Sequence, residues 1–375
     1  MTQEPNIFPY IARLLQGAEV VWKPLGEVVR LEKGKQLNKT ALLEEGTYPA
    51  YNGGVSFSGF TNTYNYEENT IIISQGGASA GFVNFVTTKF YANAHCYVIL
   101  PNTELVENRF VYHFLKSNQE ILMSRQLGAG IPALRTSEIL GIQIPLPPLS
   151  VQQEIVRILD KFTQLEAELE AELDCRKRQY EYYRNNLLSY EGNEVEWKTL
   201  DQISENLDSK RQPITSGLRT SGKIPYYGAS GIVDYVEDYI FDGDFLLISE
   251  DGANLLARNT PIAFSVSGKI WVNNHAHILK FRTYEERRFI EFYLNKTDLT
   301  PYISGAAQPK LNKKNLNSIK IPIPPLEEQQ RIVTILDKFD TLVNSISEGL
   351  PKEIALRRKQ YEYYREKLLT FINNQ

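Results

Sequence analysis

The side chains best suited to chemistry in this sequence are basic and amide groups that gather in two corresponding stretches of the chain. Asn and Gln can pair with the edge of adenine, and Arg or Lys with the edge of guanine, so these groups favour contact with DNA. The alternative interpretation is a solvated surface, which describes most groups of lysines. We predict DNA contact for two sets of residues: Lys33, Lys35, Gln36, Lys39, Asn52, Gln75 and Arg135 in the first stretch, and Lys210, Arg211, Arg219, Lys223, Tyr227, Lys310, Lys313 and Lys314 in the second.

Two glycine motifs suggest nucleotide binding, but their surroundings argue against it. Residues 217–223 have the G-x-x-x-x-G-K spacing of a phosphate loop, yet Ile224 and Pro225 follow where the loop needs Ser or Thr and a helix. Residues 128–133 fit a loose dinucleotide fingerprint but follow a predicted helix instead of a strand. The sequence contains no acyl-transfer, methyltransferase or nuclease signature, so we predict a non-catalytic chain.

Neither the histidines nor the cysteines predict a metal site. His95 and His275 occupy matching positions after an Asn, and no Cys or carboxylate cluster with ligand spacing surrounds them. We interpret them as structural histidines. Cys96 and Cys175 cannot build a disulfide framework or a zinc site, which favours a reducing cytoplasm.

Length and charge set the remaining limits. A chain of 375 residues predicts two or three domains. The formal net charge is −4, so any DNA contact must come from local clusters on a mildly acidic molecule. No apolar run reaches the roughly 18 residues that a membrane span needs, and the first residues do not resemble a signal peptide. We therefore expect a cytoplasmic protein without a membrane partner.

The chain contains a tandem repeat with a long period. Residues 144–162 read IPLPPLSVQQEIVRILDKF and residues 321–339 read IPIPPLEEQQRIVTILDKF. The block RKRQYEYYRNNLL at 176–188 returns as RRKQYEYYREKLL at 357–369, and weaker echoes connect the segments upstream. Two connector segments are thus nearly identical, whereas the two units between them differ. This pattern indicates one shared role for the connectors and two different roles for the units.

Each connector is predicted to form a long helix with a seam of apolar residues spaced three and four apart. We expect the two helices to pack against each other as an antiparallel coiled coil, although each seam could instead dock on another protein. The second connector is four residues longer and contains Gly349-Leu350-Pro351, which predicts a break or a sharp kink. The predicted seam residues are Ile155, Phe162, Leu165, Leu169, Ile332, Phe339, Leu342 and Ile346.

The two differing units are predicted to be β-rich with a few helices, because short apolar runs alternate with Gly- and Asn-containing turns. Residues 10–15 and 20–22 resemble the end of the first connector and the start of the second unit, so a circular organisation with adjacent termini is expected. The predicted fold class is α+β. The expected segments are a first unit at 1–143, of which 1–19 is a stub completing the distal connector, a first helix at 144–192, a second unit at 193–320 and a second helix at 321–375.

This arrangement resembles the specificity subunit of type I restriction-modification systems. The resemblance rests on a divergent unit that ends in G-x-x-x-P-x-L, followed by I-x-I-P-x-P-P-L-x-x-Q-x-x-I and a long helix, all repeated once. Residues 128–134 and 142–155 carry one copy, and residues 305–311 and 319–332 carry the other. Two departures are Arg135-Thr136-Ser137, where the second copy has Asn312-Lys313-Lys314, and the Gly-Leu-Pro break.

The resemblance implies two target recognition domains, each reading one half of a bipartite site in double-stranded DNA. It also implies that the paired helices, with pseudo-two-fold symmetry, fix the spacer and dock two methyltransferase subunits, and that two restriction-translocase subunits can join. S-adenosylmethionine, ATP and Mg²⁺ would then belong to those partners. The alternatives are the recognition region of a fused restriction-methyltransferase, and a coiled-coil scaffold without a DNA role.

Overall fold

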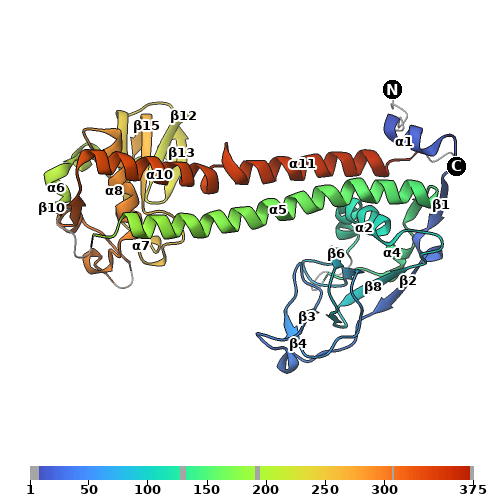
Figure 1. Ribbon diagram of the computed structural model, residues 1–375. Coiled ribbons are helices and arrows are strands. Elements are labelled where there is room, and N and C mark those ends of the chain that lie inside the picture. The colour runs from blue at the N-terminus through green and yellow to red at the C-terminus, as the bar shows by residue number, and fades with distance from the viewer. Residues whose placement is uncertain (1–7, 127–131, 191–194, 306–307, 372–375) are drawn as a thin grey trace. The chain divides into compact units, whose positions relative to one another are not determined.

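The computed structural model describes residues 8–126, 132–190, 195–305 and 308–371 (Figure 1). The chain divides into two compact units. Unit 1 comprises residues 1–170 and 353–375, and unit 2 comprises residues 171–352. Helix α5 (Leu149–Leu187) contributes its first part to unit 1 and its last part to unit 2. The segment boundaries predicted above stay a prediction, because here each unit includes parts of both connector helices.

Unit 1 contains a four-stranded sheet in the order β2-β8-β5-β6, a three-stranded sheet in the order β4-β3-β7 and a two-stranded ribbon of β1 and β9. Its strands are β1 (Val21–Pro24), β2 (Val29–Lys33), β3 (Tyr48–Tyr51), β4 (Gly59–Thr61), β5 (Thr70–Ser74), β6 (Val83–Val86), β7 (Tyr91–Ala92), β8 (Cys96–Pro101) and β9 (Gln143–Leu146). Its helices, besides α5, are α1 (Pro9–Leu15), α2 (Asn108–Ser117), α3 (Gln119–Ser124), α4 (Thr136–Leu140) and α11 (Gly349–Leu369), of which the first turn belongs to unit 2.

Unit 2 contains a six-stranded sheet in the order β11-β16-β14-β15-β12-β13 and a ribbon of β10 and β17. Its strands are β10 (Glu196–Thr199), β11 (Glu205–Asn206), β12 (Ser221–Gly228), β13 (Gly231–Val236), β14 (Phe241–Ser249), β15 (Ala263–Val272), β16 (Ala276–Lys280) and β17 (Lys320–Ile323). Its helices, besides the end of α5, are α6 (Leu200–Ile203), α7 (Asn254–Ala257), α8 (Tyr284–Lys296), α9 (Lys313–Asn317) and α10 (Leu326–Asn344). The predicted α+β class, with β-rich units and long helices, is confirmed.

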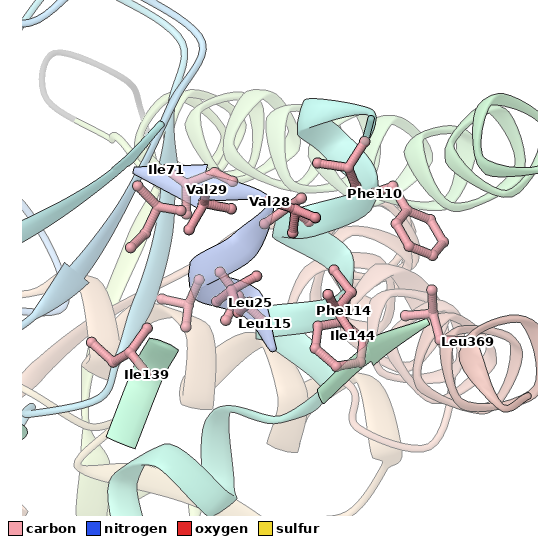
Figure 2. Close-up of a cluster of buried hydrophobic side chains, with 14 of the residues drawn as sticks. Leu25, Val28, Val29, Ile71, Phe110, Phe114, Leu115, Ile139, Ile144 and Leu369 are labelled. Atoms are coloured by element: carbon pink, nitrogen blue, oxygen red, sulfur yellow. The ribbon is translucent and has the colours of Figure 1, made fainter. Parts of the chain in front are cut away.

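The main core of unit 1 joins its sheet to its helices. Because successive side chains of a strand point to opposite faces, Ile71 and Ile73 of β5 enter this core while Ile72 enters a smaller one. Helix α2 covers the sheet with Phe110 and other apolar residues. Figure 2 shows Leu369 of α11 beside residues of α2 and β9, so the C-terminal helix is part of the same core.

Unit 2 repeats this arrangement. Leu246 and Ile248 of β14 pack with Phe289 of α8 and Leu336 of α10, while Leu247 on the opposite face joins a separate cluster. Each connector helix therefore supplies buried residues to the core of a β-rich unit, in addition to its contact with the other connector helix.

The predicted antiparallel helix pairing is present within each unit, and the repeated phenylalanine contacts the partner helix in both. In unit 1, the ring of Phe162 stacks on Tyr364 of α11, with centroids 5.3 Å apart. In unit 2, the ring of Phe339 stacks on Tyr180 and Tyr183 of α5, with centroids 6.1 and 5.4 Å apart. The repeated phenylalanine thus packs against the repeated tyrosine block in both units.

A helix break is present as predicted, but it lies at residues 345–348, and Gly349-Leu350-Pro351 form the first turn of the next helix. The break also shows that one residue was wrongly assigned to the seam. Helix α10 ends at Asn344 and α11 begins at Gly349, whose φ of +72° is readily accessible to glycine. Ile346 lies between the two helices and is 86% exposed, so its assignment to the seam is wrong. The chain is not helical at residue 346, so Ile346 cannot continue the apolar seam of a helix. Ile155 and Ile332 are fully buried, whereas Phe162, Leu165, Leu169, Phe339 and Leu342 are half-buried.

The two ribbons show the repeat at the level of strand register. Trp22 pairs with Pro145 in the β1–β9 ribbon, and Trp197 pairs with Pro322 in the β10–β17 ribbon. Helix α1 precedes the first ribbon as the end of α5 precedes the second, and its Ile11 shares a core with Leu368 of α11. The predicted circular organisation is therefore visible in unit 1, where the first and last described helices pack together.

Candidate nucleic-acid interface

In unit 1, backbone hydrogen bonds bring five loops together. The Gln75 N–H donates to the His95 carbonyl at 2.8 Å, and the Gln75 carbonyl accepts from the Leu134 N–H at 2.8 Å. The Asn93 N–H donates to the Tyr51 carbonyl at 2.9 Å, and the Lys35 N–H donates to the Ala92 carbonyl at 2.9 Å. We call this meeting of residues 34–37, 51–54, 74–77, 92–96 and 132–135 the loop junction of unit 1.

Unit 2 has the same junction, built from the equivalent residues. The Glu250 N–H donates to the His275 carbonyl at 2.9 Å, and the Glu250 carbonyl accepts from the Leu311 N–H at 2.8 Å. The Asn273 N–H donates to the Tyr227 carbonyl at 3.1 Å, and the Gln212 N–H donates to the Val272 carbonyl at 3.4 Å. The loop junction of unit 2 consists of residues 211–212, 227–230, 249–252, 272–276 and 309–312. Two sequences that share few residues here thus share one hydrogen-bonding scaffold.

The junction of unit 1 collects the predicted DNA-contacting residues of that unit. Lys35, Gln36, Asn52 and Arg135 are exposed, and Gln75 is half-buried. The two remaining residues flank it, since exposed Lys33 ends β2 and exposed Lys39 lies in the 3-10 turn Lys39–Ala41. The structure therefore places these side chains together, and their contact with DNA stays a prediction.

The junction of unit 2 collects only part of the predicted set. Within it, Tyr227 is half-buried at the end of β12 and Lys310 is half-exposed. Exposed Lys210 ends the 3-10 turn Asp208–Lys210 and directly precedes the junction. Lys313 and Lys314 are exposed on α9, which follows the junction in sequence. For the other predicted residues of this unit, hydrogen bonds or position in the sheet suggest different roles.

Arg211 belongs to a buried ionic network instead of a free surface. Its guanidinium lies 2.7 Å from Glu250 Oε2 and donates to the Ala276 carbonyl at 2.7 Å, and its side chain is 13% exposed. Burial tends to raise the pKa of Glu250, but the hydrogen bond from Arg211 and the nearby charge of His277 outweigh it, so that pKa lies below its ordinary value. We interpret a side chain held in this way as structural, and its predicted contact with DNA stays a prediction.

His277 connects this network to the backbone. Its Nδ1 lies 2.6 Å from Asp208 Oδ2 and its Nε2 lies 2.7 Å from the Leu311 carbonyl oxygen. The ring thus links the Asp208 carboxylate to the backbone of Leu311. Burial tends to raise the pKa of Asp208, but the hydrogen bond with His277 outweighs it and holds that pKa below its usual range.

Arg219 and Lys223 lie outside the loop junction. Arg219 pairs with Asp234 of β13 at 3.0 Å, lies over the ring of Tyr226 and donates to the Ile214 carbonyl. Lys223 is exposed on β12, the strand that pairs with β13. Because Arg219 holds a loop to a hairpin, we interpret it as structural.

Sequence reasoning missed the residue at the centre of the second junction. Glu250 was not among the predicted residues, although ISQGG at 73–77 and ISEDG at 248–252 align it with Gln75. That alignment is the signal that identifies it. The residues singled out at 128–131 lie outside the described residues, so nothing tests the glycine motif there.

Within the described ranges, no group of His, Cys, Asp and Glu has an arrangement that could hold a metal ion. His275 instead faces Asp251, with Nδ1 2.8 Å from Oδ2, and His95 supplies its carbonyl to Gln75. In the same ranges, no helix combines the length and the apolar character needed to cross a membrane.

Comparison with known proteins gives a consistent family assignment. The family model of the type I restriction modification DNA specificity domain matches twice, at residues 18–174 and 193–356. A type I restriction enzyme specificity subunit of Escherichia coli, EcoR124I/EcoR124II, is 34% identical over 96% of this chain and 97% of its own length. A putative specificity subunit of Haemophilus influenzae is 46% identical over 48% of this chain and 47% of its own length.

Solved structures share the fold. A type I restriction-modification S subunit from M. genitalium matches with a TM-score of 0.69 and 22% identity, over 100% of this chain and 99% of its own. A chain from a study of complex assembly in a type I restriction-modification system matches with a TM-score of 0.54 and 19% identity, over 94% and 98%.

The prediction that this chain is not itself an enzyme agrees with these relatives, which are described as specificity subunits of type I restriction enzymes. The two matches of the family model coincide with the two halves of the internal repeat. With its repeated loop junction and its paired helices, the chain belongs to the family of DNA specificity subunits of type I restriction-modification systems.

Proposed function

We propose that each unit reads one half of a bipartite site in double-stranded DNA through its loop junction. The observation that carries this proposal is the shared scaffold with different side chains. The N–H and carbonyl groups of Gln75 and Glu250 make equivalent bonds, yet their side chains and neighbours differ in charge. A common scaffold with unlike surfaces is what two readers of different base sequences require.

The connector helices fix the spacer between the half-sites and dock two methyltransferase subunits in this proposal. The nearly identical connectors support it, because two copies of one partner need two equivalent surfaces. Tyr182 and Tyr363 occupy matching positions in the repeated block and are 64% and 52% exposed. Exposed tyrosines are typical of the residues that contribute most to protein interfaces.

Two restriction-translocase subunits complete the proposed complex. S-adenosylmethionine is carried by the methyltransferase subunits, and ATP and Mg²⁺ by the restriction-translocase subunits. The assembled complex acts in the cytoplasm, where it meets DNA.

Exchange of one reader tests the proposal. Residues 195–320 are replaced by the corresponding unit of a specificity subunit with another target, and the methylated sites of the host genome are mapped. One half-site should change while the other half-site and the spacer stay the same. A simultaneous change of both halves would contradict one reader per unit. The reciprocal exchange of the first unit is the matched control.

Salt-dependent binding separates this proposal from a scaffold without a DNA role. Neutralising phosphates releases counterions, so affinity for duplex DNA should fall steeply as the salt concentration rises. A scaffold without a DNA role would bind the methyltransferase subunits but show no such affinity. A fused enzyme would transfer methyl groups without added subunits, whereas this chain should need them.

A further inference from the structure

The two loop junctions carry different side chains at three equivalent positions, and two of these positions differ in charge. Each position is identified by its hydrogen bonds, because the backbone scaffold is the same in both units. The Tyr97 hydroxyl donates to the Leu134 carbonyl at 3.0 Å, as His277 does to Leu311. The set of unit 1 is Gln75, Tyr97 and Ala133, and the set of unit 2 is Glu250, His277 and Lys310, so that Glu250 and Lys310 bring charges that Gln75 and Ala133 lack.

Lys310 combines a fixed backbone with a partly exposed charge. Its N–H and carbonyl both bond to Ser304, at 2.8 and 2.9 Å, and the next residue, Leu311, bonds to Glu250. Its ammonium nitrogen lies 3.2 Å from Glu250 Oε1, yet its side chain is 51% exposed. The ammonium group is thus held at the surface of the junction, with donor hydrogens left for another molecule.

Glu250 is itself held from the other side. Its second carboxylate oxygen, Oε2, lies 2.7 Å from Arg211, and its side chain is only 12% exposed. A lysine side chain ordinarily samples many rotamers, and ordering it on binding weakens affinity. A carboxylate fixed by Arg211 therefore orders the Lys310 ammonium group before DNA arrives.

We propose that Lys310 is a specificity-determining residue of unit 2 that donates to the O6 and N7 acceptors of a guanine, and that Glu250 is its positioning residue. Lysine is one of the two side chains best suited to this edge of guanine. Unit 1 has Ala133 and Gln75 at the equivalent positions, so its half-site is read without this contact. The inference rests on the proposed reading of one half-site by each unit.

Replacing Lys310 by Ala in the full chain, assembled with its methyltransferase subunits, tests the contact. Affinity is measured for duplexes that carry every single-base change in each half-site. At one base pair of the second half-site, the preference for guanine should fall by about 5-fold to about 100-fold, since a direct base contact contributes this much. The first half-site should be unaffected. An equal loss for every sequence, with a shallower salt dependence, would instead identify a phosphate contact and overturn the proposal.

Two further variants separate positioning from folding. Glu250→Gln keeps the size of the side chain and an oxygen that can accept from Arg211, and urea unfolding checks that it folds. It should weaken the preference at the same base pair by a smaller factor than Lys310→Ala. Lys320→Ala removes an exposed lysine of β17 that lies outside the predicted DNA-contacting set, and should leave that preference unchanged. If Lys310→Ala keeps the wild-type preference at all positions while wild type reads a bipartite site, this inference fails and the proposed function stands. A wild-type complex without a bipartite site would defeat the proposed function itself.

Discussion

Asp160 of α5 accepts hydrogen bonds from the Nε of Arg109 in α2, at 3.0 and 3.1 Å to its two oxygens. The equivalent pair in unit 2 joins Asp337 of α10 to Arg288 of α8, with Nε 2.8 Å from Oδ1. Both aspartates belong to the repeated LDKF sequence. The repeated segment therefore fastens each β-rich unit to its connector helix, and this attachment gives a physical reason why the repeat retains an aspartate.

Replacing Arg109 by Ala should destabilise unit 1 by about 1–2 kcal/mol. Hydrogen bonds to charged groups contribute about 1.5–3 kcal/mol, and the 37% exposure of Asp160 reduces this value. Urea unfolding of the full chain measures the change. Arg157→Ala is the control, because Arg157 pairs with Glu154 on the same helix, is 70% exposed and should change stability by less than about 0.5 kcal/mol. Equal effects of the two variants would contradict the attachment.

Replacing Phe162 by Asp should separate the helix pair of unit 1. The substitution removes the stacking on Tyr364 and puts a carboxylate against a partly apolar surface, which together should lower stability by about 2–3 kcal/mol. Thermal unfolding and assembly with the methyltransferase subunits report the loss. Phe339→Asp is the matched variant in unit 2. If Phe162→Asp assembles and melts as wild type does, the seam is misassigned.

Stability should fall at acidic pH partly because of His113. This side chain is fully buried, with Nε2 2.8 Å from Asp160 and Nδ1 3.0 Å from the Tyr361 hydroxyl, and burial lowers its pKa. The unfolded chain, with a pKa near 6.5, then binds the proton more readily than the folded chain. The contribution is therefore present above about pH 6.5 and is lost as the pH falls toward the lowered pKa of the folded state.

His113→Phe removes the titrating group and introduces the residue found at the equivalent position, Phe292. The variant should be less stable at neutral pH, because Asp160 and Tyr361 lose a partner, but its free energy of unfolding should depend less on pH below about pH 6.5. Urea unfolding across a pH series measures the slope. An unchanged slope would assign the acid sensitivity to other groups.

Arg211 and Lys210 are adjacent but should give opposite phenotypes. Arg211→Ala removes the buried guanidinium that contacts Glu250 Oε2 and the Ala276 carbonyl, and should destabilise unit 2 by about 2–3 kcal/mol, since Lys310 still pairs with the other oxygen of Glu250. Lys210→Ala removes an exposed charge and should leave stability within about 0.5 kcal/mol while weakening DNA binding. Urea unfolding and DNA titrations of both variants distinguish the structural role of Arg211 from the DNA-contacting role of Lys210. A stable Arg211→Ala variant with weak DNA binding would reverse the two assignments.

Four residues inserted after Glu168 should lengthen the spacer by one base pair, or two at most. The insertion adds about 6 Å of helix and rotates the rest of α5 by only about 40°. Each base pair rises about 3.4 Å. Mapping of methylated sites reads the spacer, and the half-site sequences should not change.

The insertion also separates Glu166 from Glu170, which both pair with Arg358 of α11. Arg358→Ala is therefore the control, since it removes this contact without changing the helix length and should keep the spacer. An unchanged spacer after the insertion, with full activity, would show that the helices hold partners without measuring DNA.

The sequence by itself determined the organisation of this protein. Apolar residues spaced three and four apart set the helices, and Gly349 and Pro351 set the break, because these signals act through local backbone geometry. The repeat also predicted that residues 20–22 correspond to the start of the second unit, and the structure shows the two matching ribbons there. The sequence also predicted that several lysines lie close to the loops of the two junctions. Their place in the fold depends mainly on which strands they follow along the chain.

Only the tertiary structure decided which charged residues are free and which are buried. Lys210 and Arg211 are neighbours in sequence, yet one is exposed and the other pairs with Glu250, a residue 39 positions away. The apolar pattern predicted that Phe162 lies in the helix seam. Which ring it stacks on, that of Tyr364, depends on how far the two antiparallel helices are offset along their axes. Ion pairing and helix offset are set by contacts between distant segments, and no local pattern in the chain encodes them.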